Sequence, residues 1–234
     1  MVIDKQFDGV TVYDCPELIH EYVHYIQDLS TTYGLNKVNY LMKMITNYFY
    51  IAQNSEEIKV PIIDNSEYMI DAEDYYFLLD GDIELTEYKP DIKIVSYELT
   101  NHFFDKLEIE VCSCILKFSD KKTYNFGART INEGMAYLIE KNFYNNKNAP
   151  IIPYHICVML ADHIYRDNNF SDLDILALCD VSLMYSHPHN TYICILNLMN
   201  QEKKHFSDSK EIYTYVLERV IFQDNKDTVF IIKF

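Results

Sequence analysis

The chain contains the pattern His20-Glu21-Tyr22-Val23-His24. Histidines four residues apart share one face of an α-helix, so both imidazoles can reach one metal ion. Zinc binds imidazole nitrogen, and a glutamate after the first histidine can hold the metal-bound water as a general base. The simpler interpretation is two histidines on one side of an amphipathic helix. A zinc site therefore needs a third ligand from elsewhere in the chain.

The segment ARTINEGMAYLIEKNFY, residues 128–144, offers that ligand in Glu133, early in an expected helix. The small residues Gly134 and Ala136 would let this helix approach another one closely. Catalytic zinc takes three protein ligands and leaves a fourth position for water. The sequence therefore predicts Zn²⁺ held by two histidines and Glu133.

The two segments HEYVH and NEGMAYLIE resemble the gluzincin class of zincin-type HExxH zinc metallopeptidases. NEGMA is similar to the third-ligand segment of the aminopeptidase N family. The resemblance implies an enzyme, a zinc metallopeptidase (hydrolase), with His20, His24 and Glu133 as metal ligands and Glu21 as the catalytic base. The two motifs lie much farther apart here than in those aminopeptidases, and Tyr137 stands where thermolysin-like enzymes carry an aspartate. The resemblance therefore implies the residues of the metal site, but it implies nothing about the substrate.

In such a site a zinc-activated water attacks the peptide bond, while Glu21 takes its proton and passes it to the leaving amine. The oxyanion needs a further donor. Glu140 is a candidate acceptor for the second N–H of a ligand histidine, although an exposed helix charge is its more ordinary role. Candidates for the oxyanion donor are Tyr137, His155, His163, His187 and His189.

The predicted function is hydrolysis of a peptide bond in a specific intracellular protein or peptide substrate. Two alternatives stay open. One is a non-catalytic zincin-fold protein-interaction module, which would not need the carboxylate of Glu21. The other is a zinc hydrolase that acts on a non-peptide amide.

Two further pairs of metal-binding side chains have simpler explanations. His187-x-His189 fits a polar turn between two helices, and Cys112-x-Cys114 fits core packing because no second cysteine pair lies nearby. We find no glycine-rich phosphate loop and no dinucleotide fingerprint.

The composition of the chain limits the classes of partner that it is expected to bind. The 234 residues carry a net charge of −16, which disfavours binding to nucleic acid and to anionic lipid. The sequence shows no signal-peptide pattern and no apolar run long enough to span a membrane. Six scattered cysteines without such a signal fit reduced thiols, so we expect a cytoplasmic protein. The oligomeric state is not predicted.

We expect one α+β domain, residues 1–234: mainly helical, with an N-terminal metal-binding helix, a small mostly antiparallel sheet in the middle and a helical C-terminal half. An edge strand within 91–119 is a candidate for binding an extended peptide substrate. In the N-terminal part we expect a hairpin in 1–13, a helix from Pro16 ending near Gly34, and a helix 35–53 with an apolar face. The middle part should hold strands within 56–120 around a helix or loop at 68–80. The C-terminal part should hold helices 128–143, 153–167, 171–185, 189–203 and 209–222, and a closing strand in 228–234.

Overall fold

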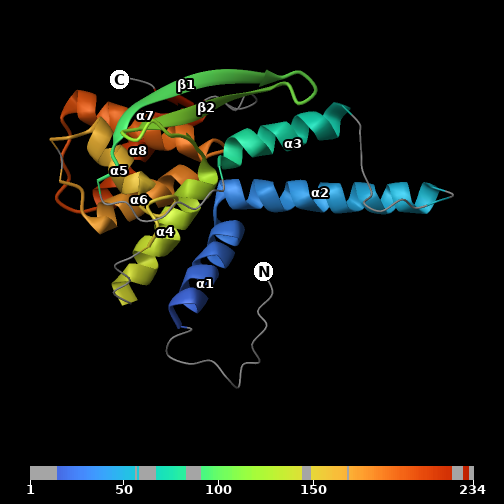
Figure 1. Cartoon of the computed structure of the whole chain (residues 1–234), viewed down its shortest axis with the longest axis horizontal. Helices are drawn as coiled ribbons and strands as arrows, with labels where there is room; N and C mark the ends of the chain where they lie inside the picture. The colour runs from blue at the N-terminus through green and yellow to red at the C-terminus, as the bar shows by residue number, and fades with distance from the viewer. Residues whose placement is uncertain are drawn as a thin grey trace.

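The computed structural model describes residues 15–55, 57, 67–82, 91–143, 149–167, 169–222 and 229–231. It confirms a mainly helical α+β fold with an N-terminal helix, a central antiparallel sheet and a helical C-terminal half (Figure 1). The elements in chain order are α1 Cys15–Ser30, α2 Thr32–Asn54, α3 Glu67–Asp80, β1 Ile94–Phe104, β2 Ile109–Phe118, β3 Thr123–Phe126, α4 Ala128–Phe143, α5 Ile156–Ile164, α6 Asp172–Leu183, α7 Pro188–Glu202, α8 Lys210–Arg219, β4 Val220–Phe222 and β5 Val229–Ile231.

The sheet has the strand order β1-β2-β3, and both pairs are antiparallel. Strand β3 was not expected separately, because its four residues are too few to show alternation. The last helix is shorter than predicted: α8 ends at Arg219, and residues 220–222 pair with 229–231 as a second small sheet. The hairpin expected in 1–13 and the strand expected near 57–63 lie outside the described residues, apart from residue 57.

The break between α1 and α2 falls at Thr31, and the predicted helix end at Gly34 is wrong. Thr31 caps α2: its side chain accepts a hydrogen bond from the Gly34 N–H (3.0 Å), and its own hydroxyl donates to the Gln27 carbonyl (2.7 Å). Gly34 lies in the first turn of α2, where a Cβ would come within 2.4 Å of the Gln27 carbonyl oxygen. The missing side chain therefore lets the two helices meet at a sharp corner.

Helix α4 is central to the helical part of the fold. It packs against α1, α3, α5, α6 and α7, whereas α3, α5 and α7 also cover the sheet. Its start is fixed by a backbone contact, because a Cβ on Gly127 would lie 2.3 Å from the Asp80 carbonyl at the end of α3. This contact holds the first turns of α4, which carry Glu133, in a defined direction.

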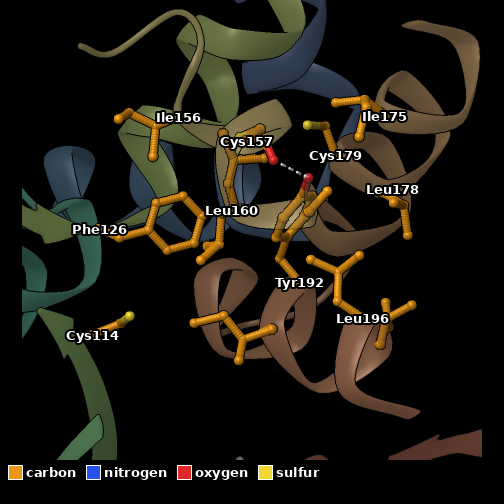
Figure 2. Packing of buried hydrophobic residues seen from close by; sticks show 14 of the residues in the cluster. Cys114, Phe126, Ile156, Cys157, Leu160, Ile175, Leu178, Cys179, Tyr192 and Leu196 are labelled. Carbon is orange, nitrogen blue, oxygen red and sulfur yellow. Dashed lines mark hydrogen bonds between the residues drawn. The ribbon is translucent and has the colours of Figure 1, made fainter. Parts of the chain in front are cut away.

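The main hydrophobic core lies among the C-terminal helices and the inner face of the sheet. Tyr192 is fully buried there, and its hydroxyl donates to the Cys157 carbonyl at 2.9 Å (Figure 2). The N-terminal helices contribute little to this core. Only Val23 and Gln27 are buried in α1, and only Tyr33 and Gly34 in α2.

Helix α1 and the strand pair β1–β2 lie at opposite sides of the molecule (Figure 1). Helices α4 and α6 lie between them in that view. The structure therefore gives no support to peptide binding by an edge strand beside His20. Among the described residues, no helix combines the length and apolar character needed to cross a bilayer.

The corner at Gly34 gives a first prediction. Gly34→Ala should lower the free energy of unfolding by about 1–3 kcal/mol, because the added methyl group meets backbone atoms that cannot move aside. Urea denaturation followed by circular dichroism measures this change. Asn39→Ala, at an exposed position of the same helix, is the control and should be neutral or slightly stabilising. A Gly34→Ala variant as stable as that control would contradict the close crossing.

Candidate metal centre

The structure brings His20, His24 and Glu133 together from helices α1 and α4. The Glu133 Oε2 atom lies 3.1 Å from His20 Nε2 and 3.5 Å from His24 Nε2. One ligand atom from each residue lies within 4.8 Å of the other two, and no other such group of His, Cys, Asp or Glu occurs in the described part of the chain. The side chains are 12–24% exposed, so the cluster is enclosed but open to solvent.

Hydrogen bonds on the far side of each imidazole set its orientation. His20 Nδ1 lies 3.2 Å from Glu140 Oε2, and His24 Nδ1 lies 2.8 Å from Gln27 Oε1. The Gln27 amide nitrogen donates to the Asn132 carbonyl at 3.2 Å, which leaves its oxygen facing His24. Both acceptors require a proton on Nδ1, so in a neutral imidazole Nε2 carries the free lone pair.

Three electron-pair donors therefore point at one place: two Nε2 atoms and a carboxylate oxygen. Such donors repel one another unless protons or a cation lie between them. Ligand atoms about 2.0–2.1 Å from a tetrahedral zinc ion stand about 3.3 Å apart. The distances of 3.1 and 3.5 Å from Glu133 to the two imidazoles bracket that spacing, and all three ligand atoms lie within 4.8 Å of one another. The donor set and the two Glu133 distances therefore fit a zinc ion with two histidines and one glutamate.

The charges of the cluster are strongly coupled. Burial by itself would raise the pKa of Glu133, but hydrogen bonds and charge interactions with His20 and His24 lower that pKa to about 2. Burial lowers the pKa of His24, but the neighbouring Glu133 outweighs it and the pKa is raised. Without a metal, the same residues can thus form ion pairs between protonated histidines and a carboxylate. Such ion pairs are the structural alternative to a metal centre.

The carboxylate of Glu140 is buried, contrary to the ordinary expectation for a charge on a helix. Its hydrogen bond to His20 is the contact that was proposed for it from the sequence. It lies seven residues after Glu133, which is about two helical turns, so both carboxylates face α1. Second partners of this kind fix the tautomer of a metal-binding histidine and raise its basicity.

Glu21 is half-buried on α1, next to the first ligand candidate. Its negative charge contributes to the raised pKa of both His24 and Tyr154, which places it in the surroundings of the cluster. Sequence reasoning missed Tyr154, whose ring meets the edge of His20 with centroids 5.8 Å apart. Burial and the charges of Glu133, Glu140 and Glu21 raise the pKa of Tyr154, so its hydroxyl keeps its proton.

A small residue on α4 lies beside the segment that carries Tyr154. A Cβ on Gly134 would lie 3.4 Å from Cys157 Sγ and 3.6 Å from the Tyr154 carbonyl. Gly134 therefore faces α5 and the segment before it, and not α1. Tyr154 falls within the helix predicted over 153–167, but α5 begins only at Ile156, so Tyr154 lies in the connection between α4 and α5, and helical periodicity does not reveal its contact with His20.

The other candidate residues have contacts outside the three ligand candidates. Tyr137 is buried, and its ring centroid lies 4.9 Å from that of His155 and 5.5 Å from that of Tyr154. His187 contacts the Tyr75 hydroxyl at 3.2 Å, and His189 contacts the Cys112 carbonyl, both away from the cluster. The ring of His163 faces Tyr97. None of the six cysteines forms a disulfide, and burial raises the pKa of the Cys114 thiol to about 12, which fits core packing.

Comparisons of the chain with protein-family models, with curated proteins and with solved structures give no match. The likeness to gluzincins therefore rests on the two short segments around Glu21 and Glu133, and on nothing longer.

The convergence of three ligands predicts metal binding. Purified wild-type protein incubated with zinc and then desalted should retain about one zinc ion per chain, and His20→Ala and Glu133→Ala should each lose it. Elemental analysis beside a protein assay gives the ratio. Glu17→Ala, at an exposed position of α1, should retain the metal. Metal-free wild type would favour the ion-pair interpretation.

The hydrogen bond from His20 to Glu140 predicts a smaller, graded effect. Glu140→Gln keeps the size of the side chain but removes the charge that orients and polarises His20. Zinc affinity should fall about 10–100-fold, measured by competition with a chromophoric chelator. Glu17→Gln is the matched loss of one carboxylate from the exposed side of α1. Equal zinc affinities in Glu140→Gln and Glu17→Gln would show that Glu140 does not contribute to metal binding.

Proposed function

We propose that this chain is a zinc-dependent metallopeptidase that hydrolyses a peptide bond in an intracellular protein substrate. The observation that carries the proposal is the shared direction of His20 Nε2, His24 Nε2 and Glu133 Oε2, set by the partners of both Nδ1 atoms. A pair of histidines on a helix can arise by chance. Their meeting with a carboxylate from a helix more than a hundred residues away is harder to explain without a ligand.

Each residue has a defined task in the proposed reaction. When bound, zinc would lower the pKa of water toward neutrality and polarise the scissile carbonyl. His20, His24 and Glu133 would hold the ion, and Glu140 and Gln27 would keep the imidazoles oriented. Glu21 would take the proton from the attacking water and deliver it to the leaving amine.

Tyr154 is our candidate for the donor that stabilises the oxyanion. Its ring is in contact with His20, and its raised pKa keeps the phenol protonated near neutral pH. A protonated phenol can donate a hydrogen bond to charge that develops on the carbonyl oxygen. This role replaces those considered for Tyr137 and the histidines of the C-terminal half.

The chemistry of the surface supports part of the substrate proposal. A net charge of −16 fits a protein or peptide substrate better than a nucleic acid. Six cysteines without a disulfide fit a reducing compartment, and we propose the cytoplasm. A non-catalytic interaction module and a hydrolase for non-peptide amides are the competing functions.

The decisive experiment separates metal binding from cleavage. Glu21→Gln should retain zinc but lose about 10²–10⁴-fold in kcat/KM, because it lacks the general base. Cleavage of a diverse peptide mixture, followed by mass spectrometry, provides the readout beside a panel of small amides. Tyr154→Phe should retain zinc and lower kcat, whereas the surface variant Glu17→Gln should match wild type.

The outcomes distinguish the competing functions. Cleavage that survives in Glu21→Gln contradicts the assigned mechanism. A wild type that binds zinc and cleaves neither peptides nor amides supports the interaction module. Cleavage of small amides alone supports the other hydrolase.

A further inference from the structure

Helix α2 carries a regular apolar stripe that the core does not use. Its exposed large apolar residues include a set spaced by alternating steps of three and four, which is the 3.5-residue period of a coiled coil. This set, named here the α2 seam, consists of Leu35, Val38, Met42, Ile45 and Phe49, with exposed fractions of 37–64%. An ordinary surface helix buries such a stripe against its own domain.

The opposite face of α2 is already anchored to α3. Lys37 Nζ lies 2.7 Å from Asp80, the Tyr40 ring stacks on Tyr76 at 4.1 Å, and the Tyr76 hydroxyl donates to the Asn36 carbonyl. These contacts fix the rotation of α2 and turn the seam away from α3. Figure 1 shows the C-terminal part of α2 extending past the end of α3.

The residues that flank the seam carry no charge. In heptad terms, the positions next to it are Asn39, Leu41, Thr46, Tyr48 and Gln53. Charged flanks select a partner of opposite sign, whereas neutral flanks let a helix meet its own copy without repulsion. Helix α2 contains no acidic residue, although the whole chain carries a charge of −16.

We propose that the α2 seam is an interface with a second copy of this chain, formed by two α2 helices packed along their seams. A twofold interface needs a self-complementary surface, and an apolar stripe with neutral flanks provides one. The negative charge lies on the other elements, and physiological salt screens its repulsion beyond about 8 Å. The proposal is independent of the metal centre and of any catalytic activity.

The test is the molar mass in solution at about 150 mM salt, by sedimentation or light scattering, at concentrations up to about 300 µM. Wild type should rise from 27.8 kDa toward twice that mass as its concentration increases. Phe49→Glu should weaken the association about tenfold or more, because it places an unpaired charge in the seam. Tyr50→Glu is the matched control, since this neighbouring aromatic residue is equally exposed (65% against 64%) but lies off the seam.

Circular dichroism should show that both variants keep their helices. The proposal is supported if wild type associates, Phe49→Glu needs a concentration about tenfold or more higher to reach the same mass, and Tyr50→Glu behaves as wild type. A wild type that keeps the mass of one chain at every concentration overturns it, whatever else covers the seam. Equal weakening by the two substitutions also overturns it, because the effect would then be one of total charge.

Discussion

The contact between α1 and α4 is the interaction on which the candidate site depends, and it is unusually polar. Helix α1 buries only Val23 and Gln27, so little apolar surface holds it in place. The described polar contacts between the two helices come from His20 and His24 with Glu133, from His20 with Glu140, and from Gln27 with the Asn132 carbonyl. Several of the atoms that position α1 are thus atoms that could also bind a metal. A change in the protonation or ligation of these atoms therefore changes the position of α1 and the metal site together.

The rest of the fold holds α4 still so that this contact can form. The close approach of Gly127 to Asp80 fixes where the helix begins, and packing against α6 and α7 fixes its inner side. Glu133 and Glu140 then face α1 from successive parts of the same helix. The C-terminal core provides the rigidity, whereas the candidate metal site lies at the edge of that core, beside the mostly exposed helix α1.

The sequence predicted features that depend on local periodicity, and it failed where distant segments meet. The spacing of His20 and His24 is a property of one helix, and the helix over 128–143 was placed with the correct bounds. Glu133 was a candidate because it lies early in a helix with small residues and because its segment resembles a known one, since no spacing reveals that α1 and α4 touch. Tyr154 could not be found in this way, because its role comes from its position in a connecting segment. Gly34 was misread because glycine commonly ends helices, whereas here it permits a close crossing.

A metal bound by α1 and α4 would also change the topology of the chain. It would join positions 113 residues apart and close a loop that contains α2, α3 and the three-stranded sheet. A covalent cross-link closing a loop of about 100 residues removes on the order of 4–5 kcal/mol of unfolded-chain entropy. A coordination cross-link acts on the same entropy for as long as the ion stays bound. The supply of metal would then decide whether α1 is tied to α4 or can open independently of it.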